Sequence, residues 1–198
     1  FNTDGTKMFV AGATGDDVGE YALTIGFDVS TASFTDAFSV VAQEIVPLSL
    51  AFSTDGTKMY VVGNASDTVF EYTLSTGFDV STASYTQGFS VAAQDSNPRG
   101  LAFNTDGTKM FVAGYTGKDI NEYTLATGFN VSTASFVDSF NVSAQDTSPS
   151  GVAFNTNGTK MFVIGQTDDD VNEYVLTTGF DVSTASFVSV FSISAQET

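Results

Sequence analysis

Acidic side chains are the residues of this sequence best suited to chemistry, because the chain contains no histidine and no cysteine. Asp and Glu number 23 against 6 Lys and Arg, which gives a formal net charge of −17. Many of the acids lie in short polar segments that follow an apolar stretch, namely GATGDD, GNASD, GYTGKD and GQTDDD. Clustered carboxylates can bind a hard cation such as Ca²⁺ or attract a basic ligand. These segments are therefore the first candidates for a functional site.

The expected ligand-binding residues come from these four segments. Three consecutive acids at 168–170 form the candidate Ca²⁺ site, and no other cofactor is expected. The aromatic ring in the third segment is the best platform for a sugar or a peptide. A rim of solvated loops is the simpler interpretation of the same acids. The candidate residues are Asp16, Asp17, Asn64, Asp67, Tyr115, Asp119, Gln166, Asp168, Asp169 and Asp170.

Enzyme chemistry has little support in the sequence. A general acid–base pair needs two carboxyl groups in different environments, whereas these acids recur symmetrically along the chain. We therefore predict a protein that is not an enzyme, with a hydrolase or lyase using surface carboxylates as the alternative. The strong negative charge also argues against binding to nucleic acids, which are held mainly by Lys and Arg. No apolar run reaches the roughly 18 residues that a transmembrane helix requires.

The segments that carry these acids belong to a repeat. The phrase FNTDGTKMFV or a close variant begins at Phe1, Phe52, Phe103 and Phe154, and the offsets 52 − 1, 103 − 52 and 154 − 103 all equal 51. The phrase GFDVSTAS or GFNVSTAS and the pair Glu-Tyr recur in the same register. The chain is therefore one domain, residues 1–198, with repeats 1–51, 52–102, 103–153 and 154–198.

Each repeat predicts four short antiparallel strands and no helix. An Asp-Gly or Asn-Gly pair, such as Asp55-Gly56, separates the first two strands and indicates a hairpin with a type I′ turn. The later strands alternate apolar and polar residues, and no stretch keeps a period of 3.6 residues. Four antiparallel strands in a repeat of this length predict an all-β fold, a β-propeller with four tandem four-stranded blades.

The repeated phrase resembles the F-S-P-D-G-x-[KR]-[LM]-[FY]-V phrase of YVTN-type and related bacterial β-propellers. The resemblance covers the whole chain once per repeat, with threonine in place of the proline at Thr3, Thr54, Thr105 and Thr156. It implies the propeller fold and leaves the function open, because such propellers have many activities.

In a propeller, the connections that contain the acidic segments lie on one face, together with QEIVP, QDSNP and QDTSP. We expect Glu44, Asp95, Asp146 and Glu197 to add carboxylates to that face. The predicted function is a non-catalytic binding, adhesion or scaffold module that docks a protein or glycan there. The alternatives are a lectin-like propeller and a purely structural segment of a longer repeat array. The expected location is extracellular or on a bacterial or phage surface.

Two further expectations concern the assembly. The lysines Lys7, Lys58, Lys109 and Lys160 should pair across strands with Glu20, Glu71, Glu122 and Glu173 inside each blade, so a Lys58→Met change should be tolerated. The fourth repeat stops after 45 of its 51 positions (198 − 153) and supplies no closing strand. We expect a monomeric four-blade ring, with a homodimer that forms an eight-blade ring as the alternative.

Overall fold

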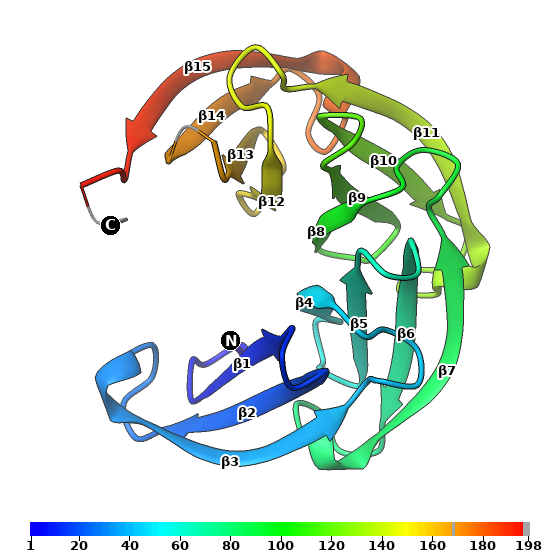
Figure 1. The fold of residues 1–198 in the computed structure, drawn as a ribbon, viewed down its shortest axis with the longest axis vertical. Helices are drawn as coiled ribbons and strands as arrows, with labels where there is room; N and C mark the ends of the chain where they lie inside the picture. Colours follow the sequence, from blue (N-terminus) through cyan, green and yellow to red (C-terminus); the bar gives the residue numbers. More distant parts are fainter. Residues whose placement is uncertain (168, 196–198) are drawn as a thin grey trace.

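The structure, a computed structural model, describes residues 1–167 and 169–195 and confirms a four-blade β-propeller. The blades follow one another around a ring (Figure 1). The first blade contains β1 (Lys7–Gly12), β2 (Asp17–Leu23) and β3 (Ala32–Ser39), and the second contains β4 (Pro47–Phe52), β5 (Lys58–Gly63), β6 (Thr68–Leu74) and β7 (Ala83–Ser90). The third contains β8 (Pro98–Phe103), β9 (Lys109–Gly114), β10 (Asp119–Leu125) and β11 (Ala134–Asn141), and the fourth contains β12 (Pro149–Phe154), β13 (Lys160–Gly165), β14 (Asp170–Leu176) and β15 (Ala185–Ser192).

The only helical elements within the described residues are four single 3₁₀ turns. They are η1 (Val29–Thr31), η2 (Val80–Thr82), η3 (Val131–Thr133) and η4 (Val182–Thr184). Each follows a side chain, such as Asp79, that accepts a hydrogen bond from the backbone N–H two residues later. This local cap holds the turn between the third and fourth strand positions of the blade. In residues 1–167 and 169–195 no helix has the length and the apolar character to cross a bilayer.

The hairpins predicted at the Asp-Gly and Asn-Gly pairs form in the second, third and fourth blades, but the predicted turn type is wrong. In the second blade Gly56 has a φ of 71°, whereas Asp55 does not have a positive φ, and a type I′ turn needs two such residues. The Gly56 N–H instead donates to the carbonyl oxygen of Ser53 at 2.9 Å. The result is a longer loop with one left-handed glycine. A β-carbon at Gly56 would collide with the ring of Phe78, so this glycine also makes room for that ring.

Aromatic rings fill the junctions between blades. At the first junction Phe9 lies 4.5 Å from Phe52, and Phe52 lies 5.4 Å from Phe78, measured between ring centroids. At the next two junctions the same positions hold Tyr60, Phe103 and Phe129, and then Phe111, Phe154 and Phe180. These trios explain the high phenylalanine content, because each junction needs large side chains to fill its core.

Each junction also contains a buried polar tie. Lys58 pairs with Glu71 inside its own blade, with 2.7 Å between Nζ and Oε1, and also donates to the carbonyl oxygen of Phe129 in the next blade. Glu71 in turn accepts the backbone N–H of Val131 at 3.0 Å. We call this set the Lys–Glu tie. It recurs at the other two junctions, through Lys7 with Phe78 and Glu20 with Val80, and through Lys109 with Phe180 and Glu122 with Val182.

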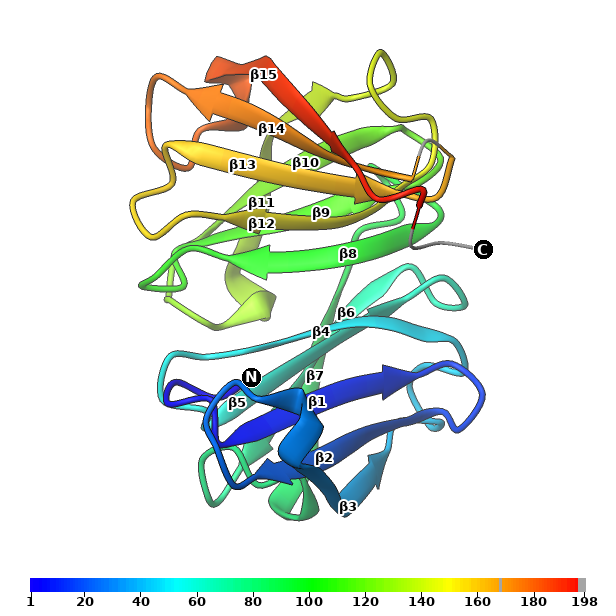
Figure 2. The same ribbon diagram turned by 90° about the vertical axis from the view of Figure 1, so that its left-hand side faces the viewer.

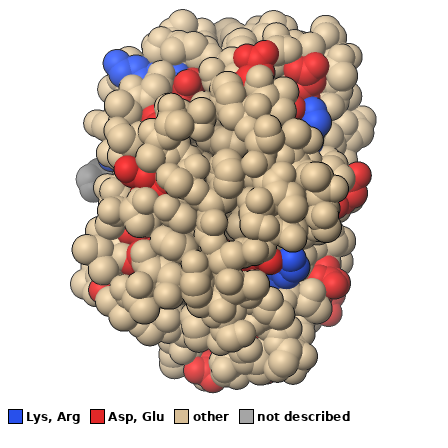
Figure 3. All heavy atoms as spheres, turned by 90° about the vertical axis from the view of Figure 1, so that its right-hand side faces the viewer, with Lys and Arg blue, Asp and Glu red and all other residues tan. Residues whose placement is uncertain are grey.

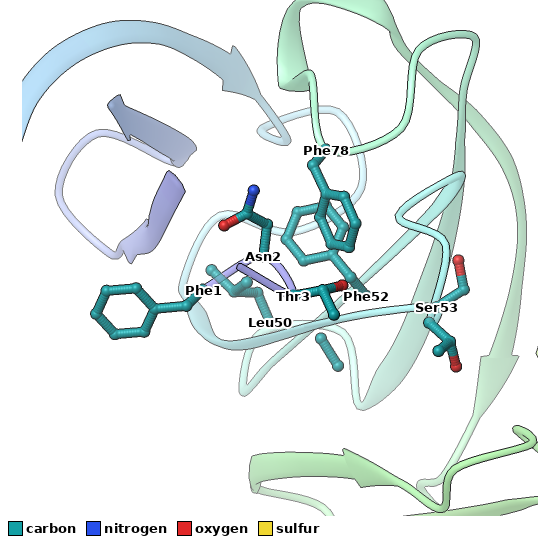
Figure 4. A pocket seen from close by; sticks show the side chains of 9 residues that line it. Phe1, Asn2, Thr3, Leu50, Phe52, Ser53 and Phe78 are labelled. Atoms are coloured by element: carbon teal, nitrogen blue, oxygen red, sulfur yellow. The ribbon is translucent and has the colours of Figure 1, made fainter. Parts of the chain in front are cut away.

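The ring is open between the first and the last blade, as Figures 1 and 2 show from two sides. The first blade has three strands within the described chain, so β1 forms its inner edge where the other blades have β4, β8 and β12. A hollow of about 360 Å³ lies next to this edge. Leu50, Phe52 and Phe78 line one side of it, and the segment from Phe1 to Thr3 lines the other (Figure 4).

Candidate functional site

The connections after the second and fourth strand positions of each blade share one side of the ring, which we call the loop face. The acids that we expected to be exposed there include three that are buried, and this corrects the expectation. Glu44 is 1% exposed, Asp95 3% and Asp146 0%. Glu44 accepts the backbone N–H groups of Val46 and Ala65 and the hydroxyl of Ser66. Glu44 therefore joins its own loop to the loop between β5 and β6. Glu197 lies outside the described residues.

Several candidate ligand residues have structural roles in turns. Asp16, Asp67 and Asp169 have φ angles of 51°, 50° and 52°, in the left-handed region that aspartate tolerates better than most residues. The carbonyl oxygen of Asp67 accepts the backbone N–H of Val91 at 2.8 Å, and Asp16 and Asp169 make the same contact in their blades. Lys118 occupies this position in the third blade. The loop conformation therefore explains why aspartate occupies these three positions.

One constellation on the loop face breaks the repeat and centres on Arg99, the only arginine of the chain. The matching positions in the second and fourth blades hold Leu48 and Ser150. The guanidinium lies over the ring of Tyr115, 3.8 Å from its centroid, which is a cation–π contact. It also donates to the side-chain oxygen of Gln166 in the fourth blade at 2.5 Å. Two of the candidate residues, Tyr115 and Gln166, are thereby brought together.

The half-buried carboxyl group of Asp119 follows a loop that lies next to the loop before Arg99. Buried Asp95 joins the two loops involved, because it accepts the backbone N–H groups of Asn97 and Gly117, both at 2.6 Å. Arg99 lies two residues after Asn97, and Asp119 lies two residues after Gly117. We call Asp95, Asn97, Arg99, Tyr115, Asp119 and Gln166 the Arg99 cluster.

Two carboxyl groups of the Arg99 cluster lie close together. Oδ2 of Asp95 and Oδ1 of Asp119 would both lie within 2.9 Å of a β-carbon placed on Gly114. Burial, and after it the charge of Asp95, raises the pKa of Asp119 above its usual range. A hydrogen bond of 2.8 Å from Asn121 to Asp119 acts in the opposite direction. A carboxyl group with a raised pKa keeps its proton to a higher pH than a solvated one.

The remaining candidate residues are not joined to the Arg99 cluster by any hydrogen bond among the described residues. Asn64 and Asp17 occupy the positions of Tyr115 and Asp119 in the second and first blades, and Asp170 that of Asp119 in the fourth. Asp168 of the candidate Ca²⁺ site lies outside the described residues. Within 1–167 and 169–195 no group of three or more acids has the geometry of a metal site. On the side shown in Figure 3 the acidic side chains are scattered.

The hollow beside β1 differs from the Arg99 cluster in its chemistry. Its lining consists of Phe1, Asn2, Thr3, Leu50, Ala51, Phe52, Ser53, Thr54 and Phe78. None of these side chains titrates near neutral pH. The Arg99 cluster is therefore the candidate site for chemistry. Arg99 was not among the expected ligand-binding residues, although an arginine that occurs once in four repeats is a visible signal in the sequence.

Comparisons with solved structures identify propellers that share this fold. A candidate 6-phosphogluconolactonase from Bacteroides fragilis matches with a TM-score of 0.66 and 14% identity, over 97% of this chain and 53% of its own. One from Bacteroides uniformis gives 0.63 and 13%, over 95% and 55%. The periplasmic gluconolactonase PpgL of Pseudomonas aeruginosa gives 0.57 and 18%, over 96% and 51%. The chain thus spans about half the length of these proteins.

No family model matches the chain, and no curated protein does. The likeness to solved structures shows the fold. The names nevertheless contradict our expectation of a non-catalytic binding, adhesion or scaffold module, together with its lectin-like and purely structural alternatives, because three similar propellers are named as lactonases. They contradict in the same way the prediction that the protein is not an enzyme. The expectation rested on the symmetric recurrence of the acids, whereas the contacts of Arg99 with Tyr115 and Gln166 break that symmetry.

Proposed function

We propose that this chain is part of a propeller hydrolase that opens a small lactone ring at the Arg99 cluster. The observation that supports it is a guanidinium held on Tyr115 and Gln166, on a strand whose preceding loop is joined through Asp95 to the loop before the half-buried Asp119. The names of the similar propellers supply the reaction class. We infer in addition that the repeats are of the YVTN type, on the repeated phrase described above.

The chemistry follows from these groups. The carboxylate of Asp119 takes a proton from a water molecule while the oxygen of that water attacks the carbonyl carbon of the lactone. The guanidinium of Arg99 stabilises the oxyanion of the tetrahedral intermediate. The bond between the carbonyl carbon and the ring oxygen then breaks, and the ring oxygen receives the proton from Asp119. Lactone and water give one hydroxy acid, and Asp119 returns to its starting state.

The charge of the chain favours an uncharged lactone over a phosphorylated one. The formal net charge is −17, and Arg99 and Lys118 are the only basic residues of the loop-face segments. A field of this sign lowers the local concentration of anions and favours neutral or cationic ligands. A neutral sugar lactone is therefore the preferred substrate class.

The test is the hydrolysis of glucono-1,5-lactone and of its 6-phosphate, measured by acid release against the spontaneous reaction. We expect acceleration of the neutral lactone, and a fall in kcat of about 100-fold in Asp119→Asn, which is typical for loss of a general base. Arg99→Met should lower kcat by about 100-fold as well, because it removes an oxyanion donor. Asp17→Asn alters the matching position of the first blade and serves as the control. No acceleration of either lactone, or an equal loss in the control, would refute the proposal.

A further inference from the structure

The first and last blades each expose a face whose counterparts are covered at the three internal junctions. The N-face belongs to the first blade and includes Val10, Tyr21, Phe27 and Val29. The C-face belongs to the fourth blade and includes Lys160, Ile164, Glu173 and Phe191. Figure 2 shows the two blades across the open side of the ring. The question is which partner fits these two faces.

The N-face carries apolar side chains in positions that are buried everywhere else. Val29 is 61% exposed, whereas its counterparts are fully buried, namely Val80, Val131 and Val182. Val10 is 45% exposed, and its counterparts are again fully buried, namely Val61, Val112 and Val163. Phe27 is exposed too, and its ring lies 5.5 Å from Phe1, as the corresponding rings Phe154 and Phe180 do at the third junction. The N-face is therefore shaped to receive a preceding blade.

The C-face carries the other half of the same junction. Phe191 is 69% exposed, whereas Phe38, Phe89 and Phe140 pack edge-on against a tyrosine of the next blade, with ring centroids 5.5, 5.6 and 5.5 Å apart. The matching tyrosine for Phe191 is Tyr21, on the N-face. Ile164 is exposed beside an apolar hollow of about 180 Å³, whereas Val62 and Ala113 at its position are fully buried.

The polar groups match in the same way. Lys160 and Glu173 form the pair of the Lys–Glu tie at 2.6 Å, but within the described residues they contact no following blade. The Lys160 side chain is 51% exposed, against 29% for Lys58. The N-face offers the carbonyl oxygen of Phe27 and the N–H of Val29, which correspond to the groups that Lys7 and Glu20 bind in the second blade.

We propose that the partner is a second copy of this chain, and that the C-face of each copy packs on the N-face of the other to close an eight-blade ring. The two faces differ, so one contact alone would leave a free face at each end of the pair. A two-fold axis repeats the contact and covers all four faces. The size agrees, because one chain matches about half the length of the similar solved propellers. The Arg99 clusters of both copies would then lie on one loop face.

Light scattering after size-exclusion chromatography tests the assembly of the full chain. We expect twice the chain mass of 20.8 kDa. Val29→Asp on the N-face and Phe191→Asp on the C-face should each give a monomer, since either removes both junctions of the ring. Val137→Asp is the matched control, because Val137 is 51% exposed on the outer strand β11 and lies on neither face. It should remain a dimer.

Mixing the two monomeric variants separates this arrangement from a symmetric face-to-face contact. One intact C-face from Val29→Asp and one intact N-face from Phe191→Asp remain in the mixture, so a heterodimer with a single junction should form. Hydrogen exchange on the unmodified chain gives a second measurement that needs no variant. The amide of Val29 should be protected to the same degree as that of Val80, because each would donate to a buried glutamate.

Three results would overturn the proposal. The unmodified chain could stay monomeric at high concentration with rapid exchange at Val29. It could form an open series of sizes, which would mean that the junctions form without closing at eight blades. The mixture of variants could stay monomeric although both variants fold with the far-UV spectrum of the unmodified chain.

Discussion

The ammonium group of Lys58 donates a hydrogen bond of 2.7 Å to the backbone carbonyl oxygen of Phe129, across the junction between the second and third blades. The sequence suggested only an exposed cross-strand pair with Glu71. That pair exists, but Glu71 is 1% exposed and Lys58 reaches the next blade as well. The junction therefore depends on a charged group that the sequence analysis treated as dispensable.

Replacing Lys58 by methionine should destabilise the protein, contrary to the expectation from the sequence. It leaves the buried carboxylate of Glu71 without its ion partner, and breaking such a pair costs about 3–5 kcal/mol when it is fully buried. Lys58 is partly exposed, so we expect about 1–3 kcal/mol, the cost of an unsatisfied buried group. Urea unfolding measures the change. Lys118→Met is the control and should cost under about 1 kcal/mol, since Lys118 is exposed on a loop and belongs to no Lys–Glu tie.

Glu44→Gln should destabilise the loop face although the loops lie at the surface. The carboxylate accepts three hydrogen bonds while buried, and an amide can accept at only one of its two terminal atoms. We expect a loss of about 1–3 kcal/mol in the free energy of unfolding, because a buried donor loses its acceptor. An equal loss in Asp16→Asn, where the backbone makes the loop contact, would contradict this assignment.

Gly56→Ala should be among the most damaging small substitutions. The residue has a left-handed φ, and the added methyl group would collide with the ring of Phe78. The strain alone is worth about 1–2 kcal/mol, and moving Phe78 disturbs the aromatic trio with Phe9 and Phe52. We expect a total loss of about 2–4 kcal/mol, in the upper range for single substitutions. Gly15→Ala has no such φ, and its methyl group would meet only the side-chain carboxylate of Asp17, which can rotate away, so the loss in the same unfolding assay should be under about 1 kcal/mol.

Asp119→Asn should make the protein more stable at neutral pH while it removes the proposed activity. The pKa of Asp119 is raised in the folded state by burial, so the folded state holds this proton more tightly than the unfolded state. Stability therefore falls as the pH rises from the unfolded pKa through the folded pKa. An asparagine at this position does not titrate, so this loss of stability is absent. Its side-chain oxygen can still accept the hydrogen bond from Asn121. Unfolding midpoints between pH 4 and pH 8 check this, and a steeper decline in the variant would contradict it.

The sequence predicted the fold well because the fold depends on short-range patterns. The glycine turns and the alternating strands are patterns within one repeat. Because they recur every 51 residues, four copies indicate the same structure independently. Turn geometry was predicted less well, because a type I′ hairpin and a longer loop with one left-handed glycine share the same Asp-Gly signal.

The candidate site was predicted only in part because its contacts cross between blades. Tyr115 and Gln166 were selected from loop variation alone, and only the folded chain shows that Arg99 joins them. The burial of Glu44 and Asp95 depends equally on loops from two blades. No local pattern distinguishes such an acid from a solvated one. The proposed Ca²⁺ site at 168–170 stays a prediction, which a calcium titration of the unfolding midpoint would test.

The Lys–Glu ties also bear on how the gene can change. Every internal junction uses the same groups, because Lys7, Lys58 and Lys109 each reach a phenylalanine carbonyl 71 residues further on. An in-frame duplication or deletion of 51 residues would recreate this junction from sequence already present, with no new contact to evolve. Recombination between repeats can therefore lengthen or shorten the coding sequence by whole blades, and only the curvature of the ring decides which copy numbers survive.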